Sequence, residues 1–415
     1  MKLVLLKLCE TLARALFVFI CIYFHSKEQS GQFGILVTLM GLFAFAFGYE
    51  RHVDIQRRHA ASPPELFDTV VAKTFSLYGL NYAVLIPLFL ICAVLWSQIT
   101  VTLALACVVI VVSEHISNKT YLLSLVTRRF RNFLVLTVIK NSINFLVVAY
   151  WVFLTDFGQM NTLVLADVIM LWACTSAVCS SIIIALWLRI NQAAKQPDSP
   201  SVWHNIKQQF KWSFWHFSIG LFAILSLQLD RIMAGSLLPL DQVGLYFRHV
   251  TLVAFIYQFF NIASFNRLLP SIYANAHKES ISSLRGRTRR EYFKVLIFAI
   301  AIYASFLLAY ISPLEQFYQR FELQVELLGI LLVTFLIRAA ADFNGLVYNA
   351  KHKEKYLLKY QMIAVAVGLC AFTGLTHWQG MVGTVIATLF AASTYFILTR
   401  LNFKHIDAQL KAAQD

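Results

Sequence analysis

Long apolar runs alternate with short polar segments along the whole chain. Each of twelve runs has about 20 residues, the helical length that crosses a hydrocarbon core. Because backbone groups in lipid must find their hydrogen bonds within the same segment, we expect every run to be an α-helix. The runs lie at 5–24, 32–50, 75–96, 98–118, 132–154, 162–189, 209–230, 242–266, 292–312, 324–348, 357–377 and 379–399. The pattern predicts an all-α polytopic membrane protein with about twelve transmembrane helices.

The composition agrees with this pattern. Of 415 residues, 59% are hydrophobic and only 13% are charged, far below the charged share of a soluble domain. In a soluble protein the net charge of +14 would suggest a nucleic-acid partner. Here the basic residues gather in alternate loops, so the charge indicates topology and we expect no nucleic-acid partner.

The basic loops predict the orientation of the chain. Lysine and arginine concentrate in the loops after the second, fourth, sixth, eighth and tenth runs and at both ends of the chain. The positive-inside rule then places these loops and both termini in the cytoplasm. The first run carries Glu10 and Arg14 and has no small-residue cleavage site, so we expect it to remain as a helix. The opposite loops are all short; the longest is 312–323.

The most polar internal connector divides the runs into two sets of six. We therefore expect an N-lobe at 1–190, a cytoplasmic linker at 191–205, and a C-lobe with a short tail at 206–415. Gln-Phe-Gly-Ile at 32–35 and Gln-Val-Gly-Leu at 242–245 stand 210 residues apart, each where an even-numbered run begins. This favours two lobes related by a pseudo-two-fold axis along the membrane normal, with a substrate path at their interface.

Ionisable residues inside the runs are the candidates for function. Each costs roughly 2.5–3.5 kcal/mol at a helix centre on insertion scales. Arg14 lies four residues after Glu10, and Asp342 four residues after Arg338, so both pairs can form on one helical face. The other candidates are Lys140 and Arg248, which lack a local acid; Glu114 and Asp167, near the ends of their runs; and Asp230 and Arg231, expected near the outer interface.

No sequence motif for catalysis or cofactor binding is found. The seven cysteines all fall in apolar runs and form no CxxC pair, and there is no Walker, HExxH or GxSxG sequence. Such motifs supply phosphate, zinc or nucleophile chemistry. We therefore expect neither an enzyme nor a bound metal or cofactor.

The segment 228–246 resembles the junction of the seventh and eighth helices in Wzx-type polysaccharide flippases. These belong to the multidrug/oligosaccharidyl-lipid/polysaccharide (MOP) exporter superfamily. The matching positions are Asp230, Arg231, Gly235, Val243, Gly244 and Tyr246. Leu269-Pro270 and Gly34 also fit the family pattern, whereas the first helix lacks the family's usual small residues.

The resemblance implies a flippase of the bacterial inner membrane that moves an undecaprenyl-pyrophosphate-linked oligosaccharide, such as an O-antigen or capsule unit, to the outer leaflet. Transport would proceed by alternating access and be coupled to an ion gradient. A cationic cavity would bind the diphosphate. The cavity candidates are Arg14, Lys140, Arg248, Arg338, Gln258 and Asn261, and the coupling or gating candidates are Glu10, Asp230, Arg231 and Asp342. The expected partners are the lipid-linked oligosaccharide, membrane lipids, and a polymerase and chain-length regulator of the same pathway.

Two other functions remain open from the sequence. A multidrug antiporter of the same superfamily exports cations and would need an acidic cavity. An envelope glycan polymerase or ligase would need a sizeable outer loop, and the loops on that side are short.

Overall fold

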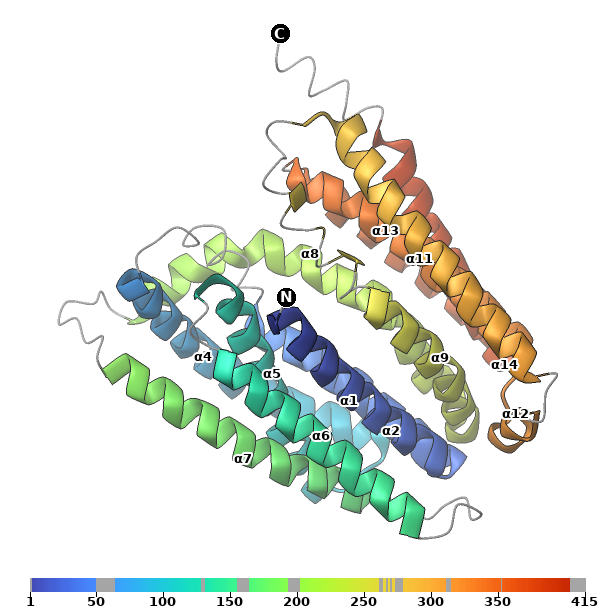
Figure 1. Cartoon of the computed structure of the whole chain (residues 1–415), viewed down its shortest axis with the longest axis horizontal. Coiled ribbons are helices and arrows are strands. Elements are labelled where there is room, and N and C mark those ends of the chain that lie inside the picture. Colours follow the sequence, from blue (N-terminus) through green and yellow to red (C-terminus); the bar gives the residue numbers. More distant parts are fainter. Residues whose placement is uncertain are drawn as a thin grey trace. The chain divides into compact units, whose positions relative to one another are not determined.

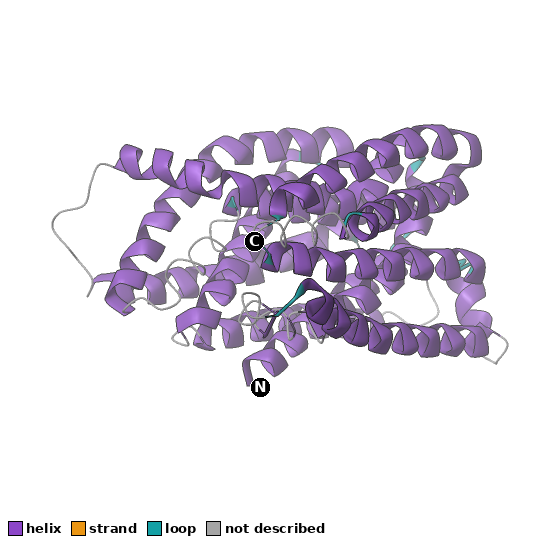
Figure 2. Cartoon of the chain, turned by 90° about the horizontal axis from the view of Figure 1, so that it is seen from above, coloured by secondary structure: helices purple, strands orange, loops and turns teal. Residues whose placement is uncertain are grey.

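The computed structural model describes most of the chain. It covers residues 2–49, 64–127, 131–154, 164–192, 202–260, 264–265, 268, 271–272, 279–310, 315–351 and 353–403. Within these ranges the elements are helices and no strand occurs (Figure 2). Each of the twelve predicted runs falls on a helix, so the predicted all-α class is confirmed.

The helices extend beyond the apolar runs in several places. Their bounds are α1 Lys2–Phe24, α2 Lys27–Gly48, α4 Pro64–Ser97, α5 Val101–Thr127, α6 Arg131–Leu154, α7 Leu165–Gln192, α8 Val202–Leu237, α9 Leu240–Phe260, α11 Ile281–Tyr310, α12 Glu315–Phe321, α13 Val325–Ala350 and α14 Glu354–Leu401 (Figure 1). The short α12 was not predicted. Gly34 lies inside α2, whose N-cap is Ser26, so the glycine does not begin the helix as expected.

Several helices meet the requirement for crossing a membrane. In the described part of the chain, α2, α4, α5, α6, α7, α8, α11 and α14 each contain a stretch long and apolar enough to span it. The long helices α1, α9 and α13, which carry Arg14, Arg248 and Arg338, are not among these candidates. The chain is therefore a multi-pass membrane protein.

The last helix, α14, is a hairpin that contains two of the predicted spans. Its direction reverses at Gly380, where φ is 58° and ψ is −132°, a conformation open to glycine. The hydroxyls of Thr376 and Thr384, on the two arms, lie 3.1 Å apart. Farther from the turn, Gln361 Nε2 donates to Tyr395 Oη at 3.4 Å. These paired positions confirm two antiparallel helices.

The chain folds as two compact units, residues 1–221 and 222–415. In unit 1, α1 packs along α6, α5 along α7, and α2 against α4 and α5 (Figure 1). The rings of Phe17 and Trp172 meet edge to face in this core, with centroids 5.2 Å apart. The division falls within α8, and most of the expected linker 191–205 lies outside the described residues. The lobe boundaries therefore stay a prediction.

In unit 2, α13 is the central helix. It packs against α9, α11 and both arms of α14. A small apolar cluster of Leu229, Phe372 and Ala387 attaches the second half of α8 to α14. This arrangement brings polar side chains of α8, α9, α13 and α14 into the interior of unit 2.

Candidate functional site

Three helices of unit 1 bring their charges to one carboxylate. Glu114 on α5 accepts from Arg14 Nη1 of α1 at 3.1 Å through Oε2. Its other oxygen, Oε1, forms an ion pair with Lys140 Nζ of α6. Lys140 has no acid nearby in its own helix, as the sequence indicates, but it has a partner on another helix. Glu114 is only 8% exposed, although it lies near the end of its apolar run.

A second carboxylate lies in the same part of unit 1. Glu10 is buried on α1, one helical turn before Arg14. Its Oε1 accepts a hydrogen bond from Asn141 Nδ2 of α6 at 3.0 Å. The partner of Arg14 on α5 could not be predicted from the spacing between Arg14 and Glu10. Asn141 directly follows Lys140 in the sequence, so two neighbouring residues of α6 contact the two carboxylates.

The two cations bound to Glu114 differ in accessibility. The Lys140 side chain is 1% exposed, whereas the Arg14 side chain is 41% exposed. The Arg14 side chain is therefore partly accessible from outside the helices of unit 1, whereas the Lys140 side chain is enclosed by them. Lys140 does not line an accessible surface, contrary to its place among the cavity candidates.

In unit 2, Arg338 joins four helical segments. Its Nε lies 3.3 Å from Asp342 Oδ1 on the same helix, α13, which confirms the pair predicted from the i,i+4 spacing. Its Nη1 donates to Ser226 Oγ of α8. Its guanidinium carbon lies 4.5 Å above the Tyr395 ring of α14. From α9, Tyr257 donates its hydroxyl hydrogen to the other Asp342 oxygen.

Asp230 and Arg231, the adjacent charges of α8, have different environments. Asp230 is 3% exposed and accepts a hydrogen bond from the Tyr246 hydroxyl of α9. Arg231 is partly exposed, and its Nη1 donates to Gln228 Oε1 at 2.8 Å. The expectation that water at the interface solvates both groups is therefore wrong for Asp230, whose charge is stabilised by protein groups.

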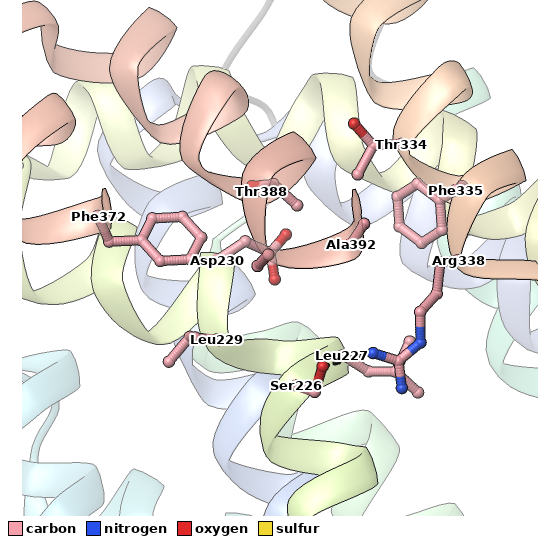
Figure 3. Close-up of a pocket in the computed structure, with 11 residues that line it drawn as sticks. Ser226, Leu227, Leu229, Asp230, Thr334, Phe335, Arg338, Phe372, Thr388 and Ala392 are labelled. Carbon is pink, nitrogen blue, oxygen red and sulfur yellow. Dashed lines mark hydrogen bonds between the residues drawn. The ribbon is translucent and has the colours of Figure 1, made fainter. Parts of the chain in front are cut away.

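A small pocket of about 30 Å³ lies between these two networks of unit 2 (Figure 3). Asp230 and Arg338 both line it, and Ser226, Thr334 and Thr388 add hydroxyls. Its apolar lining consists of Leu227, Leu229, Phe335, Phe372, Ala391 and Ala392. A carboxylate, a guanidinium and hydroxyls in an apolar wall of this size are suited to holding a water molecule or a small ion.

Two of the remaining sequence candidates lie on α9. Arg248 is fully buried and follows the buried Phe247 and Tyr246; its guanidinium is not accessible as a cavity ligand would be. Gln258 is exposed on the same helix. Asn261 and Leu269-Pro270 lie outside the described residues.

Several contributing residues were missed by the sequence interpretation. They are Ser226, Tyr257, Tyr395 and Asn141. Asn141 could have been found as a polar residue beside Lys140 in an apolar run. Nothing in their local sequence singles out Tyr257 or Tyr395, because tyrosine is common in this chain and in membrane helices generally.

No family model and no curated protein matches the chain. Solved structures do resemble it. An inward-facing MATE family multidrug resistance transporter of the MOP superfamily superposes with a TM-score of 0.66 at 15% identity, covering 98% of this chain and 96% of that one. The lipid II flippase MurJ, in an inward closed conformation, superposes with a TM-score of 0.72 at 12% identity, covering 96% and 87%.

A MATE family transporter of the MOP superfamily in the outward-facing conformation is also similar. Its TM-score is 0.62 at 15% identity, with 99% of this chain and 94% of that chain covered. These likenesses extend over nearly the whole of each chain. The chain therefore has the twelve-helix, two-lobe fold found in MATE transporters and in MurJ.

Proposed function

We propose that this protein is a flippase for a lipid-linked oligosaccharide. Its substrate would be an undecaprenyl-pyrophosphate-linked repeat unit, moved from the cytoplasmic to the outer leaflet by alternating access coupled to an ion gradient. The similarity to a lipid II flippase supports this class of transport. The segment 228–246, which resembles Wzx-type flippases, supports an oligosaccharide of the O-antigen or capsule kind.

The partly exposed side chain of Arg14 is the observation that carries the proposal. An arginine within a membrane-spanning helix is costly unless it pairs or serves a ligand. One nitrogen of Arg14 pairs with Glu114, while 41% of the side chain stays exposed. The planar guanidinium has five N–H donors, so donors remain for a diphosphate, which such groups bind bidentately.

The networks of unit 2 supply groups for coupling transport to an ion gradient. Asp230 lines a pocket and accepts a hydrogen bond from a tyrosine hydroxyl of α9. Arg338 and Asp342 tie α8, α9, α13 and α14 together. Protonation of a carboxylate in this region, or binding of an ion to it, would change the contacts among all four segments. Alternating access requires such a change between two arrangements of the helices.

A multidrug antiporter is the second candidate. The buried carboxylate of Asp230 in the unit 2 pocket favours it, as does the similarity to MATE transporters. An organic cation would pair with such a carboxylate. The flippase would transport an anionic lipid and the antiporter an organic cation, so a transport assay with each kind of molecule distinguishes the two functions.

Transport by the purified protein in proteoliposomes tests the proposal. One preparation contains a fluorescent undecaprenyl-pyrophosphate-linked oligosaccharide in the inner leaflet, and its appearance outside is read by a lectin or glycosidase. A matched preparation contains a fluorescent organic cation, and its accumulation is followed under the same imposed ion gradient. Protein-free liposomes give the background for both.

We expect gradient-dependent appearance of the glycan and cation movement at the background rate. Cation accumulation with no movement of the glycan would replace the flippase by the antiporter. Movement of undecaprenyl pyrophosphate and of its glycan-linked form at equal rates would retain the diphosphate specificity but remove the oligosaccharide from the recognised substrate.

A further inference from the structure

The ion-paired groups of unit 1 are arranged with one cation hidden and one accessible. Lys140 Nζ and Arg14 Nη1 bind the two oxygens of the same Glu114 carboxylate. The lysine side chain is 1% exposed and the arginine side chain 41% exposed. The two cations therefore cannot have the same role toward a substrate that arrives from outside the helix bundle.

The carboxylate between the two cations would compete with an anionic substrate. A guanidinium paired only with Glu114 would have most of its charge cancelled by that neighbour. The buried Glu10 carboxylate, one turn away on α1, adds a second negative charge. With Arg14 alone, these groups would sum to a charge of −1, and an incoming diphosphate would be repelled.

Lys140 changes this balance. With its ammonium included, the two cations and the two carboxylates sum to zero. Lys140 also occupies one oxygen of Glu114, so Arg14 is held through the other. The exposed guanidinium then presents its remaining donors to the outside, while the compensating charges stay buried behind it.

We propose that Lys140 is a positioning residue for anion binding by Arg14, acting through Glu114 and never touching the substrate. This inference rests on the proposed function, since it assumes a diphosphate at Arg14. It assigns Lys140 the role of a buried counter-charge to Glu114. The recognised chemistry is the diphosphate group of the lipid, and the binding group is Arg14.

The test measures the affinity of the full-length protein in nanodiscs for undecaprenyl pyrophosphate. Lys140→Met removes the charge at nearly constant volume and should weaken binding about 30-fold for each unit of negative charge on the diphosphate, the factor for two unit charges roughly 8 Å apart at an effective dielectric of 20. Adding Glu114→Gln to this variant restores the charge balance, and the affinity should return to within about threefold of the unsubstituted protein. Lys294→Met, which removes an exposed lysine paired with Glu291, is the matched control and should leave affinity unchanged.

Each outcome decides one part of the inference. If Lys140→Met binds as well as the unsubstituted protein, Lys140 does not set the charge at Arg14. If the double variant stays as weak as Lys140→Met, Lys140 is itself a substrate ligand, and the positioning role is wrong. If Lys140→Met fails to fold, the double variant alone decides. It lacks both the Lys140 ammonium and the Glu114 carboxylate, so neither is left as an unpaired buried charge.

The same measurement separates this inference from the proposed function. Absence of binding by the unsubstituted protein would overturn the diphosphate substrate and the positioning role together. Binding that survives Arg14→Gln would move the anion site away from Arg14. Weak binding by Arg14→Gln with normal binding by Lys140→Met would keep the proposed function and reject only the role of Lys140.

Discussion

Replacement of Arg338 by methionine should destabilise unit 2 strongly. The guanidinium pairs with Asp342 at 3.3 Å, donates to Ser226 and lies 4.5 Å above the Tyr395 ring. Methionine keeps the length of the side chain but makes none of these polar contacts. Asp342 would retain the Tyr257 hydroxyl as a hydrogen-bond donor but lose its counter-charge.

The expected loss follows from these contacts. Removing one partner of a buried ion pair costs about 3–5 kcal/mol. Because the Asp342 side chain is 24% exposed and keeps one donor, the lower end of this range applies. The cation–π contact adds about 1 kcal/mol. A total of about 3–4 kcal/mol corresponds to a fall of roughly 6–15 °C in the melting temperature of a domain of this size.

Thermal unfolding of the detergent-purified protein, followed by fluorescence and by size-exclusion chromatography, measures the loss. Arg289→Met is the matched control, because Arg289 stacks on Phe293 with a guanidinium-to-ring distance of 5.4 Å but is exposed on α11. It should shift the melting temperature by no more than about 2 °C. Adding Asp342→Leu to Arg338→Met removes the orphaned charge and should recover much of the loss. An Arg338→Met variant as stable as its control would refute the structural role of this network.

Two further predictions concern the α14 hairpin and the topology. A Cβ at Gly383 would lie 1.9 Å from the Leu375 carbonyl oxygen, so Gly383→Ala should prevent the two arms of α14 from packing and greatly reduce the yield of folded protein. A Cβ at Gly374 would have nothing within 4 Å, so Gly374→Ala should be neutral or slightly stabilising. Equal yields of the two variants would contradict this packing. Reporter fusions should be extracytoplasmic after Asp156 and Glu315 and cytoplasmic after Arg58, Gln196 and Lys353, and a reproducible inversion at one of these sites would overturn the predicted orientation.

The helices could be predicted from the sequence because lipid imposes a length and an apolar composition on every span. All twelve runs fall on helices for this reason. The hairpin in α14 was also predictable, since the apolar stretch 357–399 is twice the length of one span and contains Gly380 near its middle. The extensions of α4 and α8 were not, because helices outside the hydrocarbon core no longer need apolar side chains.

The ion pairs show where such prediction ends. Arg338 and Asp342 are four residues apart on one helix, and their pairing follows from helical geometry alone. Lys140 and Glu114 are separated by 26 residues and lie on different helices. Their contact depends on how α5 and α6 pack, which the apolar pattern does not specify. Sequence reasoning could therefore say that Lys140 has no acid nearby in its own helix, but could not identify Glu114 as its partner.

The measurement that tests the central claim most directly is the transport rate of Arg14→Gln in proteoliposomes. The substrate is the undecaprenyl-pyrophosphate-linked oligosaccharide, and Arg289→Gln, at an exposed position of α11, is the matched control. If Arg14 binds the diphosphate, Arg14→Gln should fold normally and lose about tenfold or more in transport at low substrate concentration, as for one charge-assisted contact. Arg289→Gln should transport at the rate of the unsubstituted protein. Equal transport rates for the two variants, at equal amounts of folded protein, would contradict the assignment of Arg14 and the flippase mechanism built on it.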